Sequence, residues 1–189
     1  MLDLAVTFLV SELNSYLVAR TGSDFGAAEV GPIVDDVGKW AINEDHLGVA
    51  LFNVEEERVH RGQLPETVLV DGQTVTRQPS LRLNLTIIVA AHFQKYDEGL
   101  KYLGLVLTFF QSHPTFTREQ SPSLDPRFER LSIELQSLSF EQLNQVWAVI
   151  GGKQLPSTIY RVRTVVLQDQ EPIGVAPPVL EVFAIVKGR

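Results

Sequence analysis

Three consecutive carboxylates in the stretch LFNVEEERV are the side chains whose types and spacing could most directly do chemistry. On an extended strand Glu55 and Glu57 point to the same side, so their carboxylates lie close together. With Asp35 and Asp36 they could hold Mg²⁺ or Ca²⁺ in a divalent-metal phosphodiesterase, because these cations prefer oxygen ligands. The same carboxylates could also act as an acid/base pair, end a strand in solvent, or form a charged face that meets a partner.

The catalytic hypotheses find little support elsewhere in the chain. Metal-dependent nucleases usually add a lysine or a histidine to such a cluster, whereas this strand continues with Arg58. The sequence has no GxSxG, GxxxxGK[ST] or helix-opening GxGxxG motif, and Gly151-Gly152 follows a predicted helix as its C-cap. It has no cysteine, which excludes thiolate chemistry. From the residues alone, the divalent-metal phosphodiesterase, the solvated strand end and the partner-facing charged surface stay open as alternatives.

The histidines show no ligand spacing such as HExxH. His92 falls late in a predicted strand, where a hydrogen-bonded structural role is expected. His46 and His60 lie near acidic residues in turns, which favours solvent exposure. His113 falls in the last turn of a predicted helix, where its partial charge suits the helix dipole.

The composition is that of one globular domain. The chain has 189 residues, 44% hydrophobic and 21% charged, with a net charge of −7. Without a basic block, that charge argues against nucleic-acid binding and binding to anionic membranes. The N-terminus has no signal-peptide pattern, and no apolar run approaches the roughly 18 residues that span a bilayer. We expect the protein to fold in the cytosol without membrane insertion.

Apolar periodicity predicts the elements that position these residues. A first helix runs from about Leu2 to a stop at Gly22, and a second covers Gln94 to Gln111. A third opens with a capping box at Ser139 and closes at Gly151. The predicted core stripes of the last two helices are Leu100, Leu103, Leu107 and Phe110, and Val146 and Trp147.

Strands are predicted at 28–30, 40–42, 49–54, 81–93, 128–138, 158–167 and 179–187, with a loop at 115–126. The Asp71-Gly72 dipeptide predicts a hairpin that joins 68–70 to 74–76. The element order indicates an α+β fold: a mixed β-sheet with about three helices packed mainly on one face and a β-hairpin arm. We expect a single domain over 1–189 with an arm at 62–80.

Four segments together resemble a known family. They are LVSELNSYL (Leu9–Leu17), LFNVEEER (Leu51–Arg58), LRLNLTIIVAAHFQKYDEGLKYLGLVLTFFQ (Leu81–Gln111) and SLDPRFERLSIELQSLSFEQLNQVWAVIGGKQLPSTIYRVR (Ser123–Arg163). They cover more than half of the chain in the family's order. The family is the cap, or tail-terminator, proteins of phage-tail-like contractile injection systems, with the antifeeding-prophage and Photorhabdus virulence-cassette type of N-terminal domain.

The resemblance implies a tail-terminator-like fold and a structural protein that is not an enzyme, with no catalytic residue, no metal and no cofactor. Such proteins form a hexameric ring on the end of the inner tube and sheath, and the ring stops polymerisation. The partners would be further copies of the chain, the tube protein and the sheath protein, in a particle assembled in the bacterial cytoplasm. A neck or baseplate-side component of the same particle is the alternative. Some family members are longer, so with its end at Arg189 we expect no additional C-terminal domain.

The resemblance also suggests a role for the three carboxylates. At the end of a strand they would form a charged face that meets a partner, since charges at an interface give register and specificity. On this hypothesis, reversing the charges should leave folding intact. The candidate interface residues are Asn53, Glu55, Glu56, Glu57, Arg58 and Arg61.

Overall fold

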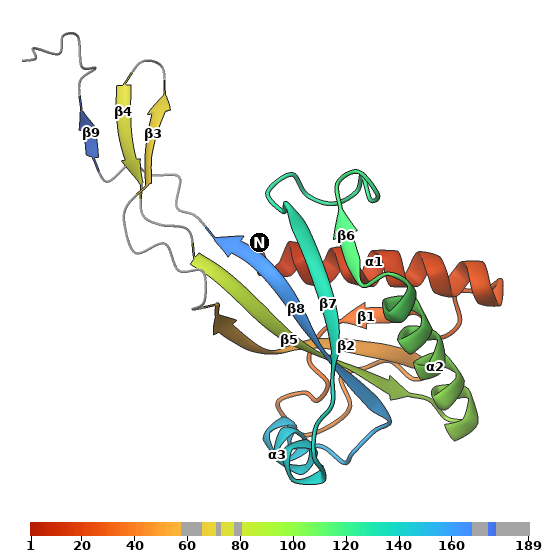
Figure 1. Cartoon of the computed structure of the whole chain (residues 1–189). Coiled ribbons are helices and arrows are strands. Elements are labelled where there is room, and N and C mark those ends of the chain that lie inside the picture. Colours follow the sequence, from red (N-terminus) through yellow and green to blue (C-terminus); the bar gives the residue numbers. More distant parts are fainter. Residues whose placement is uncertain (58–65, 71–72, 78–80, 168–173, 177–189) are drawn as a thin grey trace, which may run out of the picture.

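The computed structural model describes residues 1–57, 66–70, 73–77, 81–167 and 174–176. These residues form three helices and nine strands (Figure 1). Their bounds are α1 (Leu2–Thr21), β1 (Ala28–Val30), β2 (His46–Glu56), β3 (Glu66–Val70), β4 (Gln73–Arg77), β5 (Leu81–His92), α2 (Tyr96–Ser112), β6 (Thr115–Thr117), β7 (Arg130–Gln136), α3 (Phe140–Ile150), β8 (Ser157–Leu167) and β9 (Gly174–Ala176).

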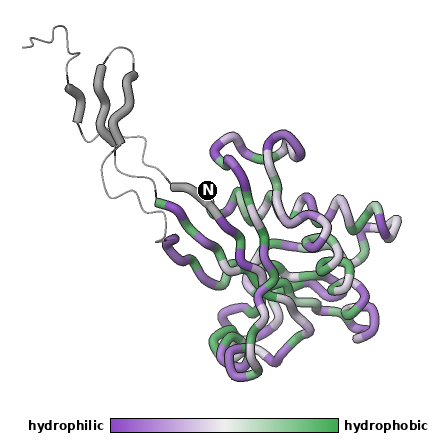
Figure 2. The backbone as a smooth tube through the Cα atoms, in the orientation of Figure 1, coloured by the Kyte–Doolittle hydropathy of each residue, from purple (hydrophilic) through white to green (hydrophobic). Residues whose placement is uncertain are grey.

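The main sheet has six strands in the order β1-β2-β5-β8-β7-β6. Only β1 and β2 are parallel, and every other neighbouring pair is antiparallel. The long strands β2, β5 and β8 form its centre, and their alternating apolar residues allow both faces to be covered. Figure 2 shows hydrophobic residues along the centre of the sheet and hydrophilic residues in the outer loops.

Helices α1 and α2 cover one face of the main sheet, which we call the α1/α2 face. Leu9, Leu13 and Leu17 of α1 are each 1% exposed, and Val106 of α2 is fully buried. They pack against the sheet residues Leu47, Val49, Leu85, Ile87, Val89, Leu131, Tyr160 and Val162. Helix α1 ends at Thr21, and Gly22, its C-cap, has the left-handed conformation that fits the predicted stop.

The opposite face, the α3 face, is only partly covered. Val146 and Trp147 of α3 join Ile88, Ala90 and Ile159 of the sheet in a second apolar cluster. The Ser139 hydroxyl accepts a hydrogen bond from the Gln142 N–H and completes the predicted capping box. Two of the three helices thus lie on one face, which confirms the predicted α+β class.

A separate three-stranded sheet is formed by β3, β4 and β9. The predicted hairpin is present, with β3 antiparallel to β4, although its turn lies outside the described residues. Figure 1 shows this small sheet beyond the end of the main sheet where β2 and β8 finish and β5 begins. The single-domain boundaries and the arm at 62–80 stay predictions.

Several expectations need correction. The segment 40–42 is not a strand and makes only an isolated bridge between Val34 and Trp40. The expected loop at 115–126 contains the edge strand β6. The strand expected at 179–187 lies outside the described residues.

The predicted stripe of α2 was also rotated relative to the sheet. Leu103 and Phe110 are buried as expected, but Leu100 is 46% exposed and Leu107 is 37% exposed. The buried face instead consists of Gly99, Tyr102, Leu103, Val106, Phe109 and Phe110. Leucines lie on both the buried and the exposed side of α2, so periodicity alone did not identify the buried face.

Among the described residues, α1 is long and apolar enough to cross a membrane, judged by length and composition alone. Asp3 and Glu12 interrupt it, so the sequence contains no uninterrupted apolar run of that length. Seven of its side chains are buried, and its buried leucines pack against the sheet. That packing is typical of the core helix of a globular domain.

Candidate functional site: a charged row on the α3 face

Strand register brings acidic and basic side chains into one row across four strands. Residues directly opposite each other on antiparallel strands share a face. Asn84 of β5 is opposite Glu55 of β2 and Arg163 of β8. Glu134 of β7 is opposite Arg161 of β8. The charged row therefore consists of Glu55, Glu57, Asn84, Arg161, Arg163 and Glu134.

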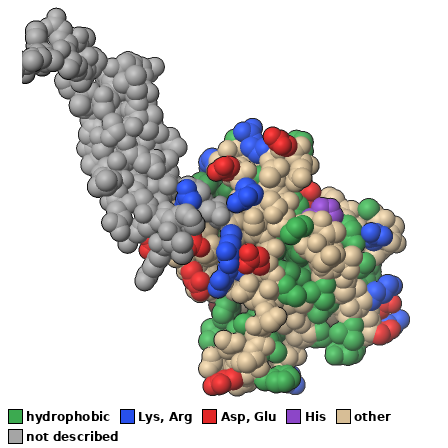
Figure 3. All heavy atoms as spheres, in the orientation of Figure 1, with side chains coloured by type: hydrophobic (Ala, Val, Ile, Leu, Met, Phe, Trp, Pro, Cys, Tyr) green, Lys and Arg blue, Asp and Glu red, His purple; other side chains and the backbone are tan. Residues whose placement is uncertain are grey.

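The row lies beside the part of the α3 face that α3 covers. Ile88 and Ala90 of β5 belong to the apolar cluster under α3. Asn84 is an even number of residues away from both on the same strand, so its side chain points to the same face. On β8, Ile159 belongs to the same cluster, and Arg161 and Arg163 point to the same face as Ile159 because they are two and four residues away. Figure 3 shows basic side chains flanked by acidic ones on this side of the molecule.

The acidic side chains of the row have partners within the chain. Arg161 Nη2 lies 3.6 Å from Glu55 Oε2, and Arg163 Nη2 lies 3.0 Å from Glu134 Oε2. The Asn84 amide donates a 2.9 Å hydrogen bond to Glu57 Oε2. The contacts of Glu55 and Glu57 offset the repulsion between these two carboxylates.

A β-bulge determines which glutamates join the row. The register between β2 and β5 shifts between Leu51 and Asn53, so Phe52 is an extra residue. A one-residue shift exchanges the two faces of a strand. Glu55 and Glu57 consequently share the face of Asn84, whereas Glu56 is opposite Leu83, whose side chain belongs to the α1/α2 core.

Three polar atoms of the row are buried without a hydrogen-bond partner among the described residues: Asn84 Oδ1, Arg161 Nε and Arg163 Nε. They are half of the six such side-chain atoms found there. Buried polar atoms are normally paired with protein or water, and leaving one unpaired costs about 1–3 kcal/mol. The row thus retains donors and an acceptor for water or for a partner.

The residues predicted from the sequence are only partly brought together. Glu55 and Glu57 are in the row, and Asn53 donates a 3.1 Å hydrogen bond to Glu55 Oε1. Glu56 belongs to the other face, and Arg58 and Arg61 lie outside the described residues. Sequence reasoning missed four members of the row: Asn84, Glu134, Arg161 and Arg163. The alternation IYRVR in β8 was the available signal, because it places both arginines on one face.

The hypothetical metal site is not assembled. Asp35 Oδ1 accepts hydrogen bonds from the N–H groups of Val37 and Lys39, so it stabilises a turn. Within the described residues, no group of three or more acidic, histidine or cysteine side chains could hold a metal ion.

Three histidines have described structural contacts. The Nδ1 of His92 lies 3.0 Å from the carbonyl oxygen of Ile42, which confirms the hydrogen-bonded role. His46 is half-buried instead of exposed, with Nδ1 2.8 Å from the Glu44 carbonyl oxygen. His113 is the C-cap of α2, and its backbone N–H donates to the Phe109 carbonyl oxygen. His60 is outside the described residues.

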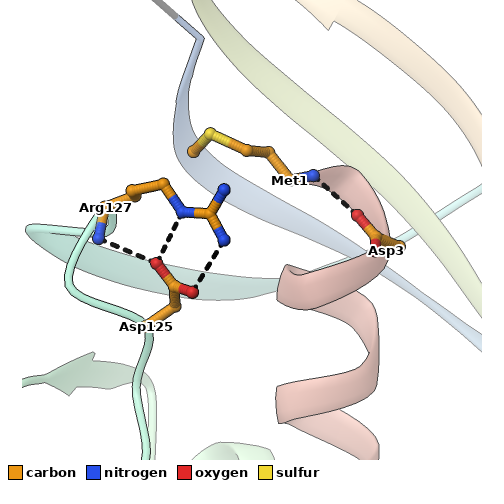
Figure 4. A network of polar contacts seen from close by, with 4 residues as sticks. All are labelled: Met1, Asp3, Asp125 and Arg127. Atoms are coloured by element: carbon orange, nitrogen blue, oxygen red, sulfur yellow. Dashed lines mark hydrogen bonds and ion pairs between the residues drawn. The ribbon is translucent and has the colours of Figure 1, made fainter.

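Away from the charged row, Asp125 and Arg127 form a polar contact in the loop before β7 (Figure 4). The Arg127 guanidinium donates two 2.8 Å hydrogen bonds to Asp125, and the Arg127 backbone N–H donates a third of 2.9 Å. These hydrogen bonds hold the pKa of Asp125 well below its usual range. Close by, the terminal ammonium of Met1 binds Asp3 at 2.6 Å. Both contacts involve exposed groups and stabilise local conformation, without convergent groups for catalysis.

The structure is an α+β domain whose α3 face carries the charged row. The family model of the Pvc16 N-terminal domain matches residues 5–181. The chain therefore belongs to the Pvc16 N-terminal domain family. No curated protein sequence matches the chain.

Two solved structures share the fold. One is the PVC sheath/tube terminator of an extracellular contractile injection system in its extended state, at 12% identity and a TM-score of 0.55. The other is the anti-feeding prophage cap, a tube-terminating cap, at 14% identity and a TM-score of 0.54. The matches cover 95% and 93% of this chain but only 64% and 59% of those chains.

Proposed function

We propose that the chain is a structural end-cap of a phage-tail-like contractile injection system. The observation that carries this proposal is the shared fold, which extends over nearly the whole chain for two proteins described as terminators. Family membership supports the same conclusion. The chain would act by occupying the end of the inner tube and sheath, so that no further subunit can add.

The cap is a ring of six copies in this proposal. A closed cyclic ring uses two different surfaces of each subunit, one on either side. Each contact would bury on the order of 1,000 Å² or more, as stable protein interfaces do. The partners are further copies of the chain, the tube protein and the sheath protein, and the particle assembles in the bacterial cytoplasm.

The charged row supports a structural role over a catalytic one. Its carboxylates are held by arginine and asparagine side chains, so none is left in a pair suited to acid/base chemistry. Charged groups in fixed positions give an interface its register and exclude wrong partners. We propose that Asn53, Glu55 and Glu57 contribute to contacts with a neighbouring protein in the assembled particle.

Deleting this chain from cells that make the particles tests the proposal. Electron microscopy should then show tubes and sheaths of uncontrolled length, or no particles. Restoring the chain should restore a uniform length. Particles of normal length without the chain would contradict the end-cap role. Particles that lack only a neck or a baseplate would indicate the alternative structural role.

A further inference from the structure

Among the residues that the structure describes, β2 has an open edge from Ala50 to Glu55. Strand β1 pairs with β2 only from Leu47 to Val49. From Ala50 to Glu55, no described strand lies on the side of β2 away from β5. Unpaired edges display backbone N–H and C=O groups that can hydrogen-bond to an added strand.

The hydrogen bonds that flank this edge show which backbone groups face outward. The Leu47 N–H donates to the Ala27 carbonyl oxygen, and the Val49 carbonyl oxygen accepts from the Gly31 N–H. Before the bulge, the backbone N–H and C=O groups of odd-numbered residues therefore point toward β1. The Glu57 N–H donates to Arg82 on the β5 side. Because backbone direction alternates along a strand, Leu51 and, after the bulge, Val54 direct their N–H and C=O groups to the open edge.

The side chains beside this edge define the chemistry of a strand that would fit. Leu51 and Val54 are apolar yet 39% and 40% exposed, and both lie on the α1/α2 face. Asn53 and Glu55 lie on the opposite face, and the Glu55 side chain is 48% exposed. An added strand would therefore meet apolar side chains on one face and a carboxylate on the other.

We propose that the open edge of β2 binds an extended segment of another protein subunit by β-strand addition. The segment carries apolar side chains on one face and lysine or arginine on the other, which match the two faces of the edge. Pairing with a second copy through the same edge is disfavoured, since it would bring Glu55 close to its own equivalent. The inference deepens the proposed end-cap role, because a cap must hold a different protein.

A peptide titration tests the proposal without any particle. The probe is an acetylated and amidated peptide of sequence Lys-Val-Lys-Val-Lys-Val-Lys, and the control peptide replaces each Lys with Glu. Binding of the lysine peptide should slow hydrogen exchange at the Leu51 and Val54 amides, as measured by NMR. It should weaken with salt, and the glutamate peptide should bind at least about tenfold more weakly.

Two variants at one position separate backbone pairing from side-chain contact. Val54→Pro removes an outward N–H without removing a hydrogen bond to β5, and proline is tolerated at an edge. Val54→Thr keeps the N–H and the branched shape. Val54→Pro should weaken the lysine peptide about tenfold, and Val54→Thr by less than about threefold.

Several results would overturn the proposal. They are absence of binding by the parent protein, protection of amides away from β2, and equal binding by a folded Val54→Pro variant. Without peptide, slower hydrogen exchange at the same amides as the protein concentration increases would show that a second copy of the chain binds the edge. That result would also overturn the proposal. If Val54→Pro does not fold, the amide protection in the parent protein decides alone. Failure of the end-cap role would appear in particle length instead, so the two proposals can fail separately.

Discussion

The carboxylate of Glu55 on β2 and the guanidinium of Arg161 on β8 lie 3.6 Å apart, although strand β5 separates their backbones. The pair therefore extends across three strands and links the β2 edge to the centre of the sheet. Both side chains are partly exposed, 48% for Glu55 and 32% for Arg161. Such a pair orients side chains more than it stabilises the fold.

A double-mutant cycle measures this relationship. Glu55→Gln and Arg161→Gln, separately and together, should give a coupling free energy of about 0.2–1 kcal/mol, as exposed ion pairs do. Urea unfolding at low and high salt gives the value, and the coupling should shrink as salt increases. A coupling free energy above about 2 kcal/mol would show that the pair is a main determinant of stability.

Charge reversal at Glu57 should be more damaging than the sequence suggested. The Asn84 amide donates to Glu57, and Asn84 is only 8% exposed. Glu57→Lys would remove the acceptor of a nearly buried donor, which we expect to cost about 1–3 kcal/mol in the free energy of unfolding. Glu57→Gln keeps an acceptor and serves as the control. Equal stability of the two variants would contradict this role of Asn84.

Trp147 should be an anchor of the cluster under α3. It is 4% exposed, so Trp147→Ala should lower the free energy of unfolding by roughly 3–5 kcal/mol. Its indole N–H has no hydrogen-bond partner among the described residues, so Trp147→Phe should cost clearly less. Chemical denaturation compares the two variants. If Trp147→Phe lowered the free energy of unfolding as much as Trp147→Ala, the indole N–H would have a hydrogen-bond partner, which would contradict this account.

Tyr160 should make stability fall at high pH. Burial raises its pKa from 10.0 to about 12, and the nearby Thr158 hydroxyl acts in the opposite direction without forming a well-aligned hydrogen bond. The folded state keeps the proton longer than the unfolded state, so its contribution is complete below pH 10 and is lost as pH approaches about 12.

Tyr160→Phe removes the titrating group and tests this behaviour. The variant should lose less stability between pH 9 and 11 than the parent protein, by thermal denaturation of both. At pH 7 it should match the parent within about 1 kcal/mol, because the hydroxyl has no aligned partner among the described residues. The same pH dependence in both proteins would contradict the burial of a neutral Tyr160.

Helix ends were predictable from the sequence where a capping residue is present. Gly22 stops α1, and the capping box at Ser139 opens α3, because both satisfy backbone groups at a helix end. The side-chain row was not predictable in the same way. It depends on the bulge at Phe52 and on the pairing of β5 with β8, which are tertiary features that no local pattern encodes.

The carboxylates illustrate the difference between predicting residues and predicting their partners. Alternation correctly grouped Glu55 with Glu57. The candidate interface also included Glu56, which the register places on the other face. It could not supply Arg161 or Asn84, which are more than twenty residues distant in the chain and reach the glutamates only through the sheet. Their role as an interface remains a proposal.

Cryo-electron microscopy of intact particles tests the end-cap role most directly. A reconstruction of the particle end, with this chain identified by a fused tag, should show six copies in one ring over the last layer of tube and sheath. Each copy should bury on the order of 1,000 Å² or more against its neighbours. Density for the chain along the tube or at the baseplate, or a copy number other than six, would contradict the account.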